Sequence, residues 1–394
     1  MSRAGPRPQP PDATTASTAL VITAGNGLGG GTETFVTARR SAGRRDGCRD
    51  RPCGAILQLM SVPAMMRRVV VTTGGVTVQE VPTPVPGPGE VLVRTLVAGV
   101  CGSDTHALHG RHPFIVLPYA AGHEVVGVVE GTGQRVTVEP DLPCWNCKNC
   151  AAGRQNVCEN LRFFGCAHDQ GAMADWFTID TRRLHDVPDE LDDRTAALIE
   201  PLSTPVHAIR LAGDVKDRTV VVLGAGTIGL LMLKVARAHG ARRVVLTARS
   251  AERRERARRF GADAVVDANA ADAVEQVRAS LGESADVVFD CVAEQSTVLQ
   301  AIGMANKGGT VVVIGVPAGD VSIPLPILQD SQLRIQGSAT YLPEDYADAM
   351  DLLRAGVVTA DDFVTGVRPL DEAAAAFADA ESGRHIKVLL AVAA

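Results

Sequence analysis

The feature that most constrains the fold is a glycine-rich segment near the middle of the chain, Gly224-Ala225-Gly226-Thr227-Ile228-Gly229. It directly follows the apolar run Val220–Leu223 and precedes a segment with the apolar spacing of an amphipathic helix. In this strand–turn–helix context, G-x-G-x-x-G predicts that a helix N-terminus binds a pyrophosphate through backbone N–H groups. The residues that we expect at this cofactor site are Gly224, Gly226, Thr227, Ile228 and Gly229.

Strand and helix patterns alternate after the glycines. The helical pattern SAERRERARRFGA is followed by the apolar run DAVVD, and the strand GGTVVVIGV comes after two further helical segments. This βαβ order predicts an α/β unit with a doubly wound parallel sheet that binds a dinucleotide.

The end of the second strand bears on the choice of cofactor. Sites for NAD place an acidic residue about 20 residues after the glycines, where it binds the ribose 2′-hydroxyl. Here the strand ends at Ala248, and Arg249, Ser250, Arg253 and Arg254 follow. Guanidinium groups suit a phosphate dianion, so we expect NADP to be preferred over NAD. The alternative is that these arginines belong to a solvated, arginine-rich helix.

Four cysteines lie within fifteen residues, at Cys144, Cys147, Cys150 and Cys158. Three of them recur at every third position, and the fourth follows a short loop, which is the spacing of a closed tetrahedral zinc site. Such a site has no open coordination position. We therefore expect a structural zinc ion that holds a small lobe, residues 144–158, in shape.

A second candidate metal site lies in the stretch from Gly99 to Glu124. Its candidate residues are Cys101, Ser103, His106, His123 and Glu124, which supply a thiol, a hydroxyl, imidazoles and a carboxylate. Thiolate, imidazole and carboxylate ligands suit zinc, and three protein ligands leave a position open for chemistry. The alternative is a buried cysteine among scattered polar residues.

Composition excludes several classes of function. The 394 residues carry a formal net charge of −6, which argues against nucleic acid as the main partner. The cysteines are grouped at metal-ligand spacing rather than dispersed as in disulfide frameworks, so we expect a reducing, cytoplasmic location. No apolar run is long enough to span a membrane or to resemble a signal peptide.

The domain organisation follows from these patterns. We expect residues 1–64 to be a disordered extension or the product of a mis-assigned start, with an arginine-rich targeting arm as a weaker alternative. The Gly25–Gly30 match to G-x-G-x-x-G within them lacks a βαβ context and is rejected. Short strands with Gly and Pro turns predict a β-rich domain over 65–202, followed by the cofactor domain over 203–340. Residues 341–394 should return to the first domain.

The order of these motifs resembles that of the zinc-containing medium-chain dehydrogenase/reductase family, nearest its sorbitol-type polyol and 2,3-butanediol dehydrogenases. The resemblance covers roughly residues 66–394 and implies a GroES-like catalytic domain interrupted by a Rossmann domain. It implies that Cys101 and His123 bind the catalytic zinc, that Ser103 and His106 relay a proton, and that Cys144, Cys147, Cys150 and Cys158 bind the structural zinc.

The third ligand of the catalytic zinc stays open between two acids. Glu124 follows His123 directly, whereas Glu200, in Ile199-Glu200-Pro201, matches the family's acid that binds the zinc or its water. An acid between apolar residues is costly to bury without a partner, although a salt-bridged helix residue is the alternative.

The resemblance implies a reversible oxidation of a secondary alcohol to a ketone, with hydride transfer to or from NADP(H). Two departures put sorbitol itself in doubt: Ala107 replaces an aromatic residue, and Thr340 replaces an arginine that contacts polyol hydroxyls. We expect a small alcohol or ketone substrate, a homo-oligomer (dimer or tetramer), and neither nucleic-acid nor membrane partners. The alternatives are a zinc-free quinone or enoyl reductase of the same fold and, from another class, a nucleic-acid-binding zinc protein.

Overall fold

The computed structural model describes residues 62–166 and 168–392. The expectations for residues 1–64 fall almost entirely outside the described residues, as does the rejected Gly25–Gly30 motif. Among the residues that are described, no helix has the length and apolar character needed to cross a membrane.

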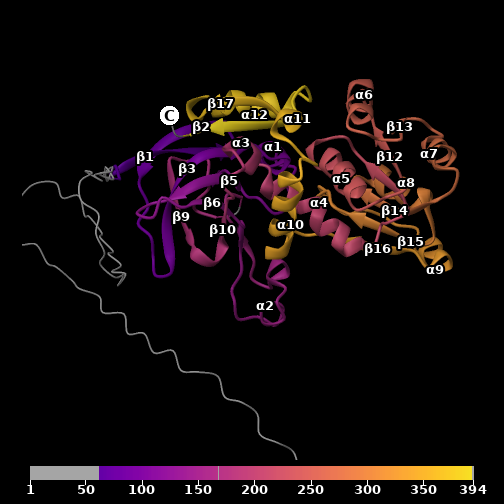
Figure 1. The fold of residues 1–394 in the computed structure, drawn as a ribbon, viewed down its shortest axis with the longest axis horizontal. Coiled ribbons are helices and arrows are strands. Elements are labelled where there is room, and N and C mark those ends of the chain that lie inside the picture. The colour runs from indigo at the N-terminus through magenta and orange to yellow at the C-terminus, as the bar shows by residue number, and fades with distance from the viewer. Residues whose placement is uncertain (1–61, 167, 393–394) are drawn as a thin grey trace, which may run out of the picture. The chain divides into compact units, whose positions relative to one another are not determined.

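The predicted α/β fold is confirmed by a six-stranded parallel sheet (Figure 1). Its spatial order is β13-β12-β11-β14-β15-β16. The strands are β11 (Thr219–Leu223), β12 (Arg243–Ala248), β13 (Ala264–Asp267), β14 (Ala285–Asp290), β15 (Ala305–Val313) and β16 (Arg334–Gly337). The order reverses between β11 and β14, and ligands of such sheets bind at the carboxyl ends of the strands beside that point.

Helices cover both faces of this sheet because its central strand is apolar on both sides. Val220 and Val222 face one core with α5, whereas Val221 and Leu223 face another with α7 and α8. The helices that follow the strands are α5 (Thr227–Ala238), α6 (Ala251–Arg259), α7 (Ala273–Leu281), α8 (Gln295–Met304) and α9 (Leu325–Ser331).

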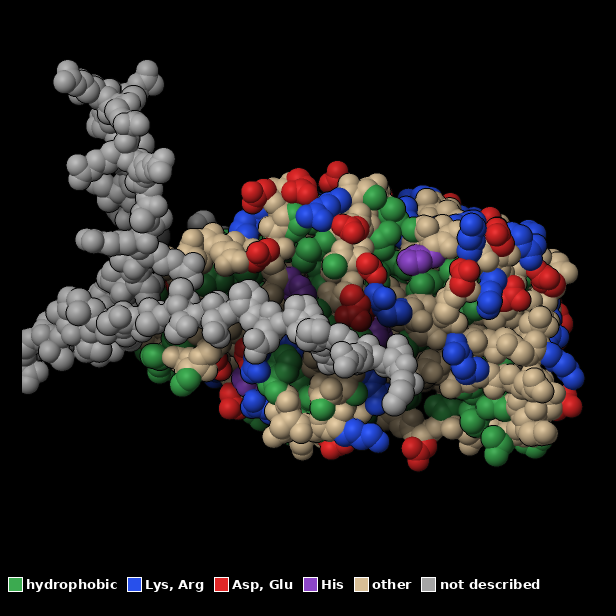
Figure 2. Space-filling model, turned by 60° about the horizontal axis from the view of Figure 1, so that its bottom comes forward, with side chains coloured by type: hydrophobic (Ala, Val, Ile, Leu, Met, Phe, Trp, Pro, Cys, Tyr) green, Lys and Arg blue, Asp and Glu red, His purple; other side chains and the backbone are tan. Residues whose placement is uncertain are grey.

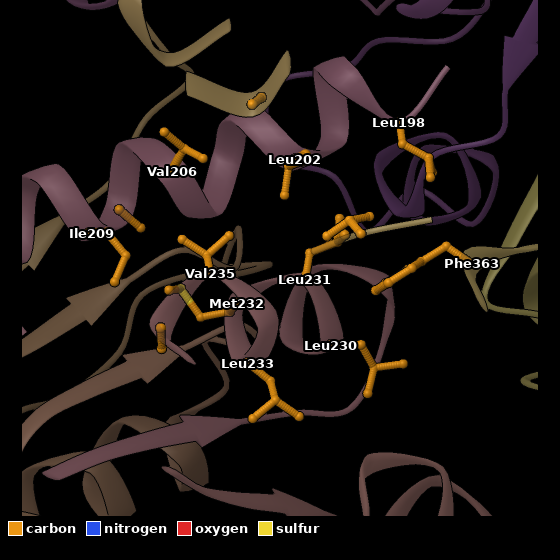
Figure 3. Packing of buried hydrophobic residues seen from close by; sticks show 14 of the residues in the cluster. Leu198, Leu202, Val206, Ile209, Leu230, Leu231, Met232, Leu233, Val235 and Phe363 are labelled. Atoms are coloured by element: carbon orange, nitrogen blue, oxygen red, sulfur yellow. The ribbon is translucent and has the colours of Figure 1, made fainter. Parts of the chain in front are cut away.

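Helix α4 (Ile199–Ala212) carries Glu200, one of the two candidate acids of the catalytic zinc site, and packs against the cofactor domain. Leu202 and Val206 on α4 pack against Leu231 and Val235 on α5 (Figure 3), and all four side chains are buried. The other side of α4 packs against α10 (Pro343–Arg354). Glu200, at the start of α4, is therefore held on a rigid element.

The β-rich part contains a second sheet in the order β10-β6-β5-β3-β18-β17, with β9 also pairing with β3. Its strands are β3 (Glu90–Gly99), β5 (Glu124–Val129), β6 (Arg135–Val138), β9 (Trp176–Asp180), β10 (Leu184–Asp186), β17 (Val364–Pro369) and β18 (Lys387–Ala391). The C-terminal strand β18 pairs antiparallel with β3, so the end of the chain returns to this sheet. Strand β17 was not predicted, because Gly366, Pro369 and its half-exposed residues weaken the strand pattern.

Smaller elements complete this part. A three-stranded sheet is formed by β1 (Met65–Thr72), β2 (Gly75–Pro82) and β4 (Tyr119–Ala120), and β7 (Asp141–Leu142) pairs with β8 (Arg162–Phe163) beside the cysteine lobe. The short helices are α1 (Gly102–Leu108), α2 (Lys148–Ala151), α3 (Asp193–Ala196), α11 (Ala360–Phe363) and α12 (Ala373–Glu381). In Figure 1 the yellow α12 lies over the N-terminal strands, where it packs against β2 and α1.

Candidate active site

Cys101, His123 and Glu124 form a cluster in which the ligand atoms lie within 4.8 Å of one another. Cys101 caps the N-terminus of α1 just after β3, Glu124 is the first residue of β5, and His123 directly precedes it. The antiparallel pairing of β3 and β5 places Glu124 opposite Gly99. A Cβ atom on Gly99 would lie 2.0 Å from Glu124 Oε2, so only glycine leaves room for that carboxylate. The donor set of one thiol, one imidazole and one acid fits a catalytic zinc ion.

His123 is oriented by a cysteine that the sequence did not single out. Its Nδ1 atom lies 3.3 Å from the Sγ atom of the buried Cys166, and the ring of Phe163 packs edge-on against the imidazole at 5.5 Å. Burial opposes a charge on His123, but the sulfurs of Cys166 and Cys101 raise the pKa of its imidazole well above the usual value. This part of the site therefore favours positive charge, which fits a divalent cation.

Asp104 hydrogen-bonds the backbone at Cys101. It is fully buried, accepts a hydrogen bond from the backbone N–H of Cys101 at 3.1 Å, and accepts another from the hydroxyl of Tyr119 at 2.9 Å. Asp104 also lies within 4.8 Å of the ligand atoms of His123 and Cys166. No role was predicted for this acid from the sequence, although it stands three residues after Cys101.

The two candidate acids differ in their partners. The Nζ atom of the buried Lys387 lies 2.5 and 2.6 Å from the two carboxylate oxygens of Glu124. Glu200 instead accepts a hydrogen bond from the hydroxyl of Tyr341. Burial, reinforced by the nearby charge of Glu124, raises the pKa of Glu200 to about 7. Neither Lys387 nor Tyr341 was predicted, and the only signal for Lys387 was a single lysine within an apolar strand.

Ser103 and His106, the two residues predicted to relay a proton, both lie on α1. Ser103 Oγ is buried and has no hydrogen-bond partner among the described residues. His106, at the exposed side of α1, has its pKa lowered by partial burial and by the charges of Arg111 and His109. No hydrogen bond joins Ser103 to His106 within the described ranges.

The four lobe cysteines meet at one point, with sulfur–sulfur distances of 3.4 Å for Cys144–Cys158 and 3.5 Å for Cys147–Cys150. Backbone N–H groups of Cys150 and Glu159 lower the pKa of Cys147 to about 6. Burial, by contrast, raises the pKa of Cys150 to about 12. Four thiols packed this closely, with one already acidic, fit a structural zinc ion.

The glycine motif forms the predicted cradle between β11 and α5. Gly224 has a φ of +100°, and a Cβ atom on Gly229 would lie 1.9 Å from the carbonyl oxygen of Gly224. Gly226 caps α5 and has open space where a Cβ atom would be, so the first N–H groups of the helix are accessible to a ligand. The hydroxyl of Thr227 donates to the carbonyl of Ile386, and Ile228 packs against the core. Both side chains therefore contact the protein itself.

A hollow of about 120 Å³ continues from the glycines past the end of β12 and is lined by Ala248, Arg249 and Arg253. Ser250 caps α6 by accepting a hydrogen bond from the N–H of Arg253 at 3.2 Å. The Arg253 guanidinium makes no hydrogen bond or ion pair with the described residues. Arg254 is different, since it pairs with Asp267 at 3.0 Å and donates to two backbone carbonyls.

Basic and acidic side chains are mixed on the surface (Figure 2). Figure 2 shows Lys and Arg side chains interspersed with Asp and Glu side chains, without a continuous basic stripe on this face.

Comparisons with known proteins place this site in a family. Residues 87–189 match the alcohol dehydrogenase GroES-like domain, and residues 227–355 match the zinc-binding dehydrogenase domain. D-xylulose reductase A of Aspergillus niger is 33% identical over 321 residues, which cover 77% of this chain and 90% of that protein.

Two solved structures are also similar. One, described as a zinc-binding dehydrogenase of Sinorhizobium meliloti 1021 bound to NADP, is 34% identical with a TM-score of 0.77 over 84% of this chain and 100% of the other. The other, the 2R,3R-butanediol dehydrogenase of Bacillus subtilis, is 25% identical with a TM-score of 0.75 over 83% and 100%. The chain belongs to the zinc-binding alcohol dehydrogenase family and is a zinc-dependent alcohol or polyol dehydrogenase that uses a nicotinamide cofactor.

Proposed function

We propose that this enzyme interconverts a small secondary alcohol, of polyol or vicinal-diol type, and its ketone with NADP(H). The observation that carries the proposal is the cluster of Cys101, His123 and Glu124, together with the buried Glu200 at the start of α4, which is near enough for His123 and Glu124 to shift its pKa. When bound there, zinc acts as a Lewis acid that lowers the pKa of the alcohol, and the nicotinamide ring exchanges the hydride.

The protein's own groups would then bind, orient and deprotonate the substrate. Cys101 and His123 would hold the metal, with Glu200 as the third ligand, directly or through water. Lys387 supports this assignment because it already neutralises Glu124 and occupies both of that residue's oxygens. Glu124 would thus shape the site's charge rather than donate to the metal. Zinc analysis of E200Q and E124Q tests this division: only E200Q should lose metal.

Ser103 would accept the alcohol proton. Its hydroxyl is buried and unpartnered among the described residues, so it is available to a substrate, and a positioned hydroxyl next to a reacting oxygen can relay a proton. His106, which is exposed, would pass the proton to water.

The preference for NADP rests on Arg249 and Arg253, which line the hollow where a ribose 2′-phosphate would lie. Ala248 stands at the end of β12, where an NAD site places an acid, and the acid that does line the hollow, Glu294, lies 3.7 Å from Arg249. The relative from Sinorhizobium meliloti, which was solved with NADP, supports the same choice. The ratio of kcat/KM with NADP to that with NAD tests it, and a clear preference for NAD would overturn it.

The substrate class is supported by the relatives named for D-xylulose and butanediol. A panel of polyols, vicinal diols and the matching ketones, assayed with NADP(H), tests this class. We expect turnover of small secondary alcohols and little turnover of primary alcohols.

Two further proposals concern the domain boundaries and the oligomeric state. The boundaries 65–202, 203–340 and 341–394 are supported by the pairing of β18 with β3, and limited proteolysis would test them. The expected dimer or tetramer would be tested by the mass of the purified enzyme in light scattering.

A further inference from the structure

Asn156 lies where the cysteine lobe meets the segment that carries Tyr341. It sits in the short 3-10 turn Gln155–Val157, two residues before the lobe cysteine Cys158, and only 7% of its surface is exposed. A buried amide needs partners for both of its N–H groups. Its partners therefore show which elements the lobe holds together.

The Asn156 amide bridges two elements of the active site. Its Nδ2 atom donates to the carbonyl oxygen of Ala339 at 3.1 Å and lies 3.4 Å from Nε2 of His207 on α4. His207 Nδ1 lies 2.7 Å from the carboxylate of Asp345. With Nδ1 donating to that carboxylate, Nε2 is left as an acceptor, so both N–H groups of Asn156 are satisfied.

Thr340 is held in a conformation that its side chain disfavours. Its φ of +48° lies in the left-handed region, where a β-branched residue is an outlier. Two hydrogen bonds tie the segment to Asn156: the bond from Asn156 to Ala339, and a bond of 3.3 Å from the hydroxyl of Thr340 to the backbone carbonyl of Asn156. Such strain persists only where the surroundings impose it.

The backbone direction at Thr340 decides where the next side chain goes. Tyr341 is 3% exposed, packs edge-on against Tyr346 at 5.3 Å, and donates its hydroxyl to Glu200. If Thr340 relaxed to a negative φ, the chain would leave Asn156 and the Tyr341 hydroxyl would be drawn away from Glu200.

We propose that Asn156 is a positioning residue for the reaction, through which the structural lobe fixes Thr340 and so places Tyr341 on Glu200, the proposed third metal ligand. The lobe would thus contribute to catalysis and not only to folding. This inference rests on the proposed role of Glu200.

The test uses the zinc-loaded, full-length enzyme and three variants: N156A, N149A and N156A/T340G. Asn149 is the matched control, because its amide donates to the carbonyl of Val157 and accepts from Arg154 within the same lobe, and it makes no hydrogen bond to the described residues 338–342. We expect N156A to keep both zinc ions and its affinity for NADP(H) but to lose about 10- to 100-fold in kcat, with KM changing less. N149A should stay within about twofold of the wild type.

The double variant distinguishes positioning from a general structural role. Glycine adopts a positive φ without strain, so the kcat of N156A/T340G should be at least threefold higher than that of N156A. An N156A variant as active as the wild type, an equal loss in N149A, or no recovery in the double variant would each overturn the proposal.

Amide hydrogen exchange separates this inference from the proposed function. N156A, but not N149A, should speed the exchange of the amide N–H groups of Tyr341 and Leu342, whichever substrate the enzyme uses. Faster exchange in N156A of an enzyme that turns over no alcohol would support the positioning role of Asn156 and refute the proposed function. Unchanged exchange in N156A of an active enzyme would refute the positioning role alone.

Discussion

Lys387 Nζ contacts both carboxylate oxygens of Glu124, at 2.5 and 2.6 Å, and also lies 3.1 Å from the carbonyl oxygen of Val100. Both side chains are almost wholly buried, so each charge is compensated mainly by the other. Removing one partner of a buried ion pair leaves an uncompensated charge, which costs far more than the pair itself contributes.

We therefore predict that K387M lowers the free energy of unfolding by about 3–5 kcal/mol, measured by urea denaturation. The double variant K387M/E124Q should regain part of this loss, because no buried charge is left alone. The control is K307M, which removes an exposed pair with Asp330 and should change stability by less than about 1 kcal/mol. If K387M unfolded at the same urea concentration as the wild type, the energetic coupling of Lys387 to Glu124 would be contradicted.

The contact between Cys166 and His123 predicts an effect on metal retention. A group that hydrogen-bonds the second nitrogen of a ligating histidine fixes its tautomer and orientation, and its loss typically costs about 10- to 100-fold in metal affinity. We expect C166A to release zinc to a chelator faster than the wild type by about this factor, and C166S to release it less quickly than C166A. C291A, which removes a thiol from the cofactor domain, is the control. Equal release from all four proteins would exclude the orienting role.

Arg253 and Arg254 are adjacent in sequence but should differ in function. R253A should lower kcat/KM with NADP by about 10- to 100-fold, the loss of one charge-assisted contact, and should leave kcat/KM with NAD nearly unchanged. R258A, on the same helix and paired with Glu255, should change neither. A matching loss with both cofactors in R253A would show that the arginine is structural.

The sequence was most informative where a site is local. The four cysteines and the glycine motif each lie within fifteen residues, and their spacing alone constrains the geometry. It was least informative where partners are distant: Lys387 meets Glu124 across 263 positions, and Tyr341 meets Glu200 across 141. A periodicity argument cannot pair such residues, because only the sheet register and the packing of α4 bring them together.

Neighbouring residues were also hard to separate. Arg253 and Arg254 look equivalent in the sequence, but successive residues on a helix point about 100° apart. One side chain therefore lines the hollow and the other turns to Asp267. Asp104 and Cys166 were likewise visible as residues, but their role depends on the position of His123 between them.

Ser103 and Thr137 form a matched pair for the proton-transfer step, since both carry buried hydroxyls with no partner among the described residues. Only Ser103 lies beside the cluster. S103A should lower kcat by about 100-fold or more, whereas T137V, on strand β6, should leave it unchanged. Measuring kcat at saturating substrate checks this. A full rate in S103A would exclude the hydroxyl from proton transfer.

Asp345 provides the last prediction, a pH dependence of stability. Burial opposes its ionisation, but hydrogen bonds from His207, the N–H of Leu342 and Arg210 outweigh that effect and hold the pKa of Asp345 below its usual value. A carboxyl with a depressed pKa stabilises the fold above the pKa of the unfolded chain, about 3.9, and loses that contribution as the pH falls through the folded-state value.

D345N should therefore cost about 2–3 kcal/mol at pH 7, because it removes charge-assisted bonds, and the difference from the wild type should shrink below about pH 4. D348N is the control: Asp348 bonds the same Arg210 but is half exposed, so its loss should be small at every pH. Urea denaturation at pH 3, 5 and 7 checks the prediction. A constant difference between D345N and the wild type would show that the network is held by shape rather than by the charge on Asp345.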